Sequence, residues 1–331
     1  MPLKITILGL GQVGASIGLA LAKIKDQAVR VGNDREPMVM RQAEKIGAVD
    51  RTMINLPSAV KDADLVIMAL PIDEIHDTIE VIAQDLKSGA VLIDTSPIKS
   101  AVMQWAKELL PGDDRYFVTL NPSLNPAYLD DVSQDIDEAH ADLFQNSLML
   151  ITTPMGIDNS AIELVTNLTQ ILGATPLFTD AVEADGLNAS SNLLPRLVAA
   201  ALVNATVDQP GWREARKLAG AAYAQSTELV LHPEETKALG QAALLNADNA
   251  IRVLGVMMEE LQSMREAIAA NDATALQQRL EHARDAREEW ITHRMAANWE
   301  PRPDTRLPSG GEMIGKLFGI RPSTRKDKGG K

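Results

Sequence analysis

The chain of 331 residues contains no cysteine and few aromatic side chains. Without cysteine it forms no disulfide bond, offers no thiolate to a metal and has no cysteine nucleophile, which is typical of the reducing cytoplasm. Phe, Trp and Tyr make up 3% of the residues, so aliphatic side chains and Met must fill the core. No apolar run approaches the 18 residues of a membrane span, and no charged-then-apolar leader precedes the first expected strand. We therefore expect a cytoplasmic protein that does not enter a membrane.

An excess of positive charge is also lacking, since the net charge is −13. Nucleic acid is therefore a poor partner for the main body of the chain, because phosphates would be repelled. The exception is the Pro- and Gly-rich stretch 301–331, which holds eight Lys or Arg against three acidic residues. We interpret this stretch as a basic, partly disordered tail.

Strand-like apolar stretches alternate with helical patterns through the first 180 residues. The expected strands are 4–8, 28–33, 64–70, 90–94, 116–120, 147–152 and 175–178. This alternation predicts a doubly wound, parallel α/β sheet of the Rossmann type, with helices on both faces. Only helical patterns follow, over roughly 181–207, 212–230, 234–270 and 272–296. We therefore expect a dinucleotide-binding domain (1–180), an all-α substrate and dimerisation domain (181–300) that forms a homodimer, and the tail (301–331).

A glycine-rich turn follows the first expected strand and opens the first expected helix. It reads Gly9-Leu10-Gly11-Gln12-Val13-Gly14 and has the spacing G-x-G-x-x-G. In this pattern the first glycine allows the tight turn, the second lets a pyrophosphate approach the backbone, and the third lets helix and sheet pack closely. The free N–H groups at the helix start complete an anion site. These six residues are our first cofactor-binding candidates, although such turns also occur for packing reasons alone.

Asp34 ends the second expected strand, 20 residues beyond the last glycine of the turn. A carboxylate at this distance accepts a hydrogen bond from a ribose 2′-OH and repels a 2′-phosphate. Arg35 beside it can stack on adenine or accommodate such a phosphate. The pair predicts NAD as cofactor, with NADP as the alternative. Asp34 could instead have a purely structural role and cap the next helix.

Polar and turn residues also follow three later strands, at Leu70-Pro71, at Thr95 and at Asn121. The carboxyl ends of parallel strands share one edge, and ligands bind in the crevice beyond it. We therefore add Leu70, Pro71 and Thr95 to the cofactor site and expect the substrate next to Asn121.

The order of these motifs resembles the prephenate/arogenate dehydrogenase family. The similar segments are the glycine-rich turn, Asp34-Arg35, 63–71, 94–99, Ala184-Asp185, 192–196, 211–219 and Asn246. The resemblance covers about residues 3–295. It implies oxidation of a cyclohexadienol carboxylic acid with NAD or NADP, in which hydride loss and decarboxylation produce an aromatic ring on the way to tyrosine. It also implies a dimer formed by the helical domains.

Several positions that hold catalytic residues in that family hold other residues in this chain. The histidine that engages the substrate hydroxyl falls on Asn121, and the family's serine falls on Pro97, with Ser96 one place earlier, while its lysine is kept as Lys99. We take Asn121, Ser96 and Lys99 as catalytic candidates. An amide cannot take a proton near neutral pH. Asn121 is alternatively a turn residue, and Ser96 a helix N-cap.

The helical half supplies the candidates for binding a small anionic substrate. Family histidines fall on Ala184, Leu193 and Arg196, and the arginine that holds a carboxylate falls on Lys217. The substrate-binding candidates are polar or cationic: Asn125, Asn192, Arg196, Arg213 and Lys217. For Arg213 and Lys217 the alternative is a solvated helix face.

The five histidines lie on expected helix faces or ends: His76, His140, His232, His282 and His293. None has ligand spacing with a carboxylate, so we predict no metal site. Three functions stay open. They are a dehydrogenase of the prephenate type, acting on that substrate class or on another hydroxy acid; a non-catalytic NAD-binding sensor or scaffold; and a structural homodimer with a vestigial crevice.

Overall fold

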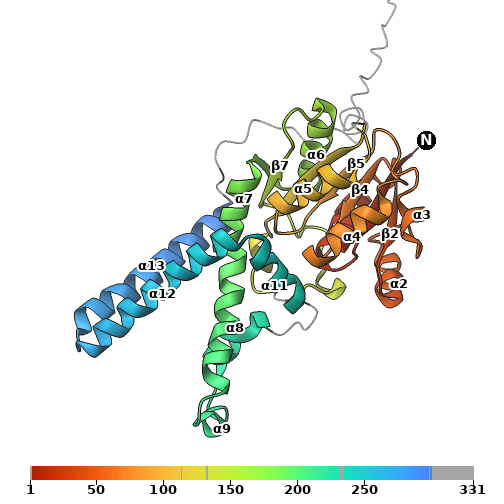
Figure 1. Ribbon diagram of the computed structural model, residues 1–331. Coiled ribbons are helices and arrows are strands. Elements are labelled where there is room, and N and C mark those ends of the chain that lie inside the picture. The colour runs from red at the N-terminus through yellow and green to blue at the C-terminus, as the bar shows by residue number, and fades with distance from the viewer. Residues whose placement is uncertain (1, 113, 132, 231–234, 298, 300–331) are drawn as a thin grey trace, which may run out of the picture.

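The computed structural model describes residues 2–299 apart from 113, 132, 231–234 and 298. The predicted basic tail (301–331) and His232 therefore lie outside the described residues. Figure 1 shows a twisted sheet with helices on both faces and, beside it, a group of long helices that extend away from the sheet.

One sheet of eight strands has the order β3-β2-β1-β4-β5-β6-β7-β8. The strands are β1 (Leu3–Leu8), β2 (Ala28–Asn33), β3 (Arg51–Thr52), β4 (Leu65–Met68), β5 (Val91–Asp94), β6 (Tyr116–Pro122), β7 (Leu148–Thr152) and β8 (Thr175–Phe178). The first six strands have the Rossmann order 3-2-1-4-5-6, in which the direction of winding reverses between β1 and β4. The Rossmann-type fold that the sequence predicts is confirmed.

The sheet is mixed rather than fully parallel, which corrects one expectation. β7 runs antiparallel to β6, with Asn121 opposite Leu150. Because the strands are antiparallel, the end of β6 and the start of β7 lie at the same edge. The connecting residues 123–147 therefore begin and end at the carboxyl edge of the parallel strands. They contain two short 3₁₀ turns, η2 (Pro126–Tyr128) and η3 (Ile136–Glu138).

Helices pack on both faces of the sheet (Figure 1). They are α1 (Gln12–Leu21), α2 (Pro37–Lys45), α3 (Leu56–Val60), α4 (Ile72–Ile82), α5 (Ser100–Leu109) and α6 (Asn159–Leu172). In α4, buried isoleucines at 72, 75, 79 and 82 form one apolar stripe at helical spacing. Aliphatic side chains fill a core on each face, as the scarcity of aromatic residues requires.

Helices make up the rest of the described chain. They are α7 (Ala181–Asn188), α8 (Leu194–Val207), α9 (Trp212–Ala215), α10 (Ala221–Thr227), α11 (Glu235–Leu245), α12 (Ala247–Ala269) and α13 (Ala273–Ala296). A π-helical turn, Ala189–Leu193, joins α7 to α8, so the expected helix 181–207 is continuous but locally widened. No described helix is both long enough and apolar enough to span a membrane.

Candidate functional site

The glycine-rich turn is shaped by its contact with the end of β4. Gly9 has a φ of +85°, and a Cβ on it would lie 2.2 Å from the carbonyl oxygen of Ala69. A Cβ on Gly14 would lie 1.9 Å from the carbonyl oxygen of Gly9. Leu70 contributes the side-chain atom nearest to such a Cβ on Gly9, at 3.0 Å, and Pro71 is the N-cap residue of α4. The first and third glycines are thus required by packing, as the motif predicts.

Asp34 holds the turn from the end of β2. One carboxylate oxygen accepts a hydrogen bond from the backbone N–H of Leu10 at 2.8 Å, and the other accepts one from that of Glu36 at 2.9 Å. Arg35 is exposed and pairs with Glu74 at 2.8 Å. Burial raises the pKa of the Glu74 carboxyl, although Arg35 opposes this shift.

Gly11 and Gln12 face the segment between β6 and β7. The backbone N–H of Gln12, the first residue of α1, donates to the carbonyl oxygen of Gln134 at 2.7 Å. A Cβ on Gly11 would lie 2.9 Å from the same oxygen. The side-chain nitrogen of Gln12 is buried and has no hydrogen-bond partner among the described residues. The missing Cβ, the outward N–H and the spare buried donor fit the pyrophosphate of a dinucleotide.

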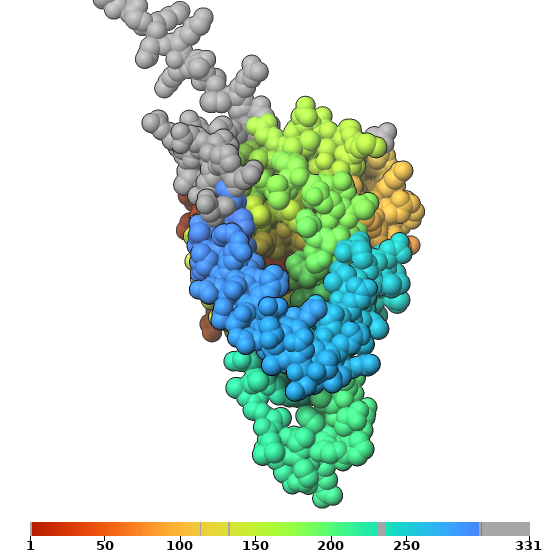
Figure 2. Space-filling model, turned by 90° about the vertical axis from the view of Figure 1, so that its left-hand side faces the viewer, coloured from red at the N-terminus to blue at the C-terminus, as the bar shows by residue number. Residues whose placement is uncertain are grey.

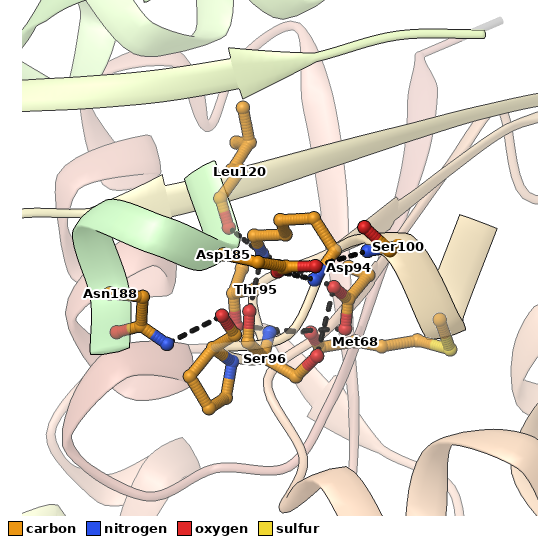
Figure 3. Close-up of polar contacts among 10 residues, drawn as sticks. Met68, Asp94, Thr95, Ser96, Ser100, Leu120, Asp185 and Asn188 are labelled. Carbon is orange, nitrogen blue, oxygen red and sulfur yellow. Dashed lines mark hydrogen bonds and ion pairs between the residues drawn. The ribbon is translucent and has the colours of Figure 1, made fainter. Parts of the chain in front are cut away.

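Lys99 is buried in a polar network after β5. Figure 3 labels its partners Asp94, Ser96 and Leu120. The Lys99 ammonium donates to the carbonyl oxygens of Leu120, at 2.7 Å, and Ser96, and it pairs with Asp94 at 3.3 Å. Ser96 donates from its hydroxyl to Asp94 at 3.0 Å. Burial lowers the pKa of Lys99, while the Asp94 carboxylate opposes that shift. The polar atoms of Ser96 and Lys99 are therefore engaged with the protein itself.

The helical half is fastened to the same loop by Asp185 of α7. Its carboxylate accepts from the backbone N–H groups of Lys99, at 2.6 Å, and Ser100, at 3.0 Å. Asn188 donates to the carbonyl oxygen of Pro97 at 2.6 Å. Asn246 donates to the carbonyl oxygen of Asp185 at 2.9 Å. These contacts cap the start of α5 with a carboxylate from a distant part of the chain.

Asn121 stands at the carboxyl end of β6, and its side chain is half-buried. Its amide has no hydrogen-bond partner in the part of the chain that the structure describes. Thr95, at the end of the neighbouring strand, donates from its hydroxyl to the carbonyl oxygen of Met68 at 3.1 Å. Asn125 instead caps η2, accepting from the N–H of Ala127 and donating to the carbonyl oxygen of Asp142. Asn121 is thus the catalytic candidate with a side chain available to a ligand.

The remaining substrate candidates are spread along the helical half. Asn192 is exposed and Arg196 half-buried, at the junction of α7 and α8. Arg213 and Lys217 are exposed, and Lys217 pairs with Glu214 at 2.5 Å. They lie in and after α9, which Figure 1 places at the end of α8 far from the sheet. A single chain therefore does not bring Arg213 and Lys217 to Asn121.

His140 lies in the segment between β6 and β7, which corrects its expected position on a helix face or end. It follows η3, and its backbone N–H donates to the hydroxyl of Ser16 in α1 at 2.9 Å. Its imidazole is 3.9 Å from a carboxylate oxygen of Asp131 and stacks on Tyr128. His140, Asp131 and Glu138 bring ligand-type atoms within 4.8 Å of one another. His76, Asp77 and Glu80 do the same. The expectation that no histidine has ligand spacing with a carboxylate is therefore wrong, while the absence of a metal site stays a prediction.

Sequence reasoning missed the roles of Asp94 and Gln134. Asp94 ends the apolar strand β5 in the family-like segment 94–99, and a carboxylate in that position is the signal that could have found it. Gln134 acts through its backbone carbonyl, and no side-chain pattern reports such a contact.

The fold and the glycine-rich turn define a Rossmann-type nucleotide-binding protein with an appended helical half. Residues 17–177 match the family model described as prephenate dehydrogenase, nucleotide-binding domain. A prephenate dehydrogenase of Bacillus subtilis is 26% identical over 302 residues, which cover 86% of this chain and 76% of that protein. One of Lactococcus lactis is 28% identical over 201 residues. That match covers 60% of this chain and 53% of the relative, so the chain matches about half of the relative's length.

Solved structures agree on the fold. Prephenate dehydrogenase from Aquifex aeolicus, in complex with hydroxyphenyl propionate and NAD+, superposes with a TM-score of 0.74 at 18% identity. The match covers 88% of this chain and 99% of that one. The comparisons bear out the resemblance to the prephenate/arogenate dehydrogenase family that the sequence indicates.

Proposed function

We propose that the protein is an NAD-dependent dehydrogenase that oxidises a cyclohexadienol carboxylic acid of the prephenate or arogenate type, a step toward tyrosine. The observation that carries the proposal is the juxtaposition of the glycine-rich turn, Asp34 and the available amide of Asn121 at one edge of the sheet. The relatives from Bacillus subtilis and Lactococcus lactis are named prephenate dehydrogenases.

The cofactor site is formed by the turn and the strand ends beside it. The N–H groups of Gln12 and Val13 at the start of α1 would bind the pyrophosphate, and Asp34 would accept from the ribose hydroxyl. Its carboxylate favours NAD over NADP, because a 2′-phosphate would meet a negative charge. When bound, the nicotinamide supplies the hydride acceptor.

The chemistry of this substrate class tolerates the exchange of histidine for asparagine. The ring loses a hydride from the carbon that bears the hydroxyl, and the ring carboxylate leaves as carbon dioxide. These two losses produce the aromatic ring, so the hydroxyl keeps its proton as the product phenol. The side chain beside the hydroxyl therefore needs only to accept a hydrogen bond while positive charge develops, and the Asn121 carbonyl oxygen can do so. Compared with histidine, asparagine is a weaker hydrogen-bond acceptor and cannot act as a general base, which contributes a factor of about 10²–10⁴ to the rate.

A homodimer would complete the substrate site. In the described chain, Ile251 is 70% exposed and Met258 68% exposed on α12, and α13 buries no described residue. Figure 2 shows α12 and α13 as the outermost layer on this side of the molecule. A second copy packed on these helices would cover the apolar side chains. The second copy would also bring its Arg213 and Lys217 to the substrate site of the first, where they would be cationic partners for a substrate carboxylate.

The test is an assay of purified protein with NAD or NADP and with prephenate, arogenate and other hydroxy acids, followed by the absorbance of the reduced nicotinamide. Turnover of prephenate or arogenate with NAD is the expected result. Turnover of other hydroxy acids, without turnover of prephenate or arogenate, would contradict the proposed substrate class.

A second candidate function is a non-catalytic NAD-binding homologue. The specific observation in its favour is that the side chains of Ser96 and Lys99 form their hydrogen bonds within the buried network. Calorimetric binding of NAD without turnover of any substrate would establish this candidate in place of the enzyme. Absence of NAD binding would remove both.

A further inference from the structure

We propose that part of the segment between β6 and β7, residues 133–140, is a strap that closes the phosphate-binding turn and that a dinucleotide must displace. The proposal depends on the cofactor site proposed above. It adds a competition between the chain's own backbone and the cofactor for one N–H group.

The competition is located at the start of α1. The N–H of Gln12 is the outward donor that a pyrophosphate would use, and it donates at 2.7 Å to the carbonyl oxygen of Gln134. That oxygen also lies against Gly11, where a Cβ would be only 2.9 Å from it. A phosphate oxygen that accepts from this N–H would have to lie where the Gln134 oxygen lies now, and two oxygens that both carry negative charge repel one another there.

Three further contacts hold the strap in place. Ile136 is only 6% exposed and belongs to the core cluster that includes α1 and α2. The N–H of His140 donates to the hydroxyl of Ser16 at 2.9 Å, within α1 itself. The side-chain amide of Gln42 in α2 donates to the carboxylate of Asp137. The strap therefore spans from α2 across the start of α1.

Charge also sets the strap against a bound pyrophosphate. Residues 123–147 contain six acidic residues and neither Lys nor Arg. Because a pyrophosphate is anionic, the closed strap and the cofactor repel one another in addition to competing for the same donor. Gln134, Asp135 and Asp137 are exposed, so this stretch can lift without opening the core beyond Ile136.

Cross-linking tests the strap directly, since the chain has no cysteine of its own. The two cysteines of the double variant Gln42→Cys/Asp137→Cys are joined by a short bis-methanethiosulfonate reagent, which forms one disulfide with each cysteine and releases sulfinate. A reductant cleaves the link, and NAD binding is measured by calorimetry. We expect binding to weaken at least tenfold in the linked protein and to return on cleavage. Each single variant, modified with the same reagent at one end, is the control and should bind NAD at least as tightly as the unmodified protein does, because it lacks the Gln42–Asp137 contact but is not linked.

The outcomes separate this proposal from the proposed function. Equal NAD affinity in linked and cleaved protein would overturn the strap and leave the cofactor site standing. Absence of NAD binding in the unmodified protein would overturn both.

Hydrogen exchange gives a second readout that needs no substitution. Adding NAD should speed exchange of the His140 amide as it leaves Ser16, while the Gln12 amide stays protected by its new acceptor. Unchanged or slower exchange at His140 would contradict displacement.

Discussion

At the end of β6, Asn121 presents a neutral amide where the family that the sequence resembles uses imidazole. We expect Asn121→His to raise the rate and to introduce a pH dependence that the native protein lacks. An ordinary histidine has a pKa of about 6.5, and only its neutral form accepts a hydrogen bond, so activity of the variant should fall as the pH drops through that value. Steady-state rates between pH 5 and 9 check this expectation.

A control follows from the lack of partners of Asn121 among the described residues. Asn121→Leu removes the acceptor and should cost roughly 10- to 100-fold in rate, the equivalent of one hydrogen bond to a developing charge. Its thermal midpoint should stay near that of the native protein. An unchanged rate in Asn121→Leu would exclude Asn121 from the chemistry.

Lys99 illustrates a residue whose structural role is the better supported one. Replacing it by Met leaves the Asp94 carboxylate, which is fully buried, without its cation. We expect Lys99→Met to lower the free energy of unfolding by about 3–5 kcal/mol, because an uncompensated charge remains inside. Lys107→Met, at an exposed lysine of α5, the helix that Lys99 precedes, should change the free energy of unfolding by less than about 0.5 kcal/mol. Urea denaturation of the two variants compares them, and equal midpoints would contradict the role given to Lys99.

The sequence predicted these residues unevenly, for physical reasons. Gly9 and Gly14 were predictable because their backbone positions leave no room for a Cβ. The buried state of Lys99 was not predictable, because a lysine is ordinarily exposed and its partners come from segments distant in sequence. The oxygen that faces Gln12 belongs to a backbone, and every residue type supplies the same carbonyl.

Among the elements, the segment between β6 and β7 departs most from a simple alternation of strands and helices. Within it, the Tyr128 hydroxyl donates to Asp142 at 2.7 Å, and this bond raises the pKa of Tyr128 to about 12. The contribution of this bond to stability is therefore complete below pH 10 and is lost as the pH rises through about 12.

Substituting Asp142 tests this bond. Asp142→Asn removes the negative charge, so the pKa of Tyr128 should fall toward its ordinary value near 10. Tyrosinate absorbance during an alkaline titration measures the shift, with Asp130→Asn, an exposed acid of the same segment, as the control. Identical titrations of the Asp142→Asn variant and the native protein would exclude the bond.

The element pattern was predictable wherever apolar periodicity was strong. The strand of residues 28–33 and the helix of residues 159–172 have the bounds that the sequence predicts. The two-residue β3 and the five-residue α3 were missed, because segments this short are too short to show a periodic pattern of apolar residues. The antiparallel direction of β7 was missed because alternation alone carries no information on strand direction.

For the whole molecule, the exposed face of α12 and α13 predicts a dimer in solution. Ile251→Glu places a charge on that apolar surface, so we expect it to shift the protein from dimer to monomer in light scattering. Ile54→Glu is the matched control, because Ile54 is 82% exposed in the sheet domain and away from these helices. A native monomer, or a dimer that survives Ile251→Glu, would contradict this interface.

A contact of one carbonyl with one N–H also has a consequence for cofactor affinity. If the strap opens in only about 1% of molecules, the apparent dissociation constant for NAD is about 100-fold above its intrinsic value. Loosening the strap, for example by Ile136→Ala, then tightens cofactor binding without changing any residue that touches the cofactor. The affinity of the glycine-rich turn is thereby set at a distance, by how well a single isoleucine packs.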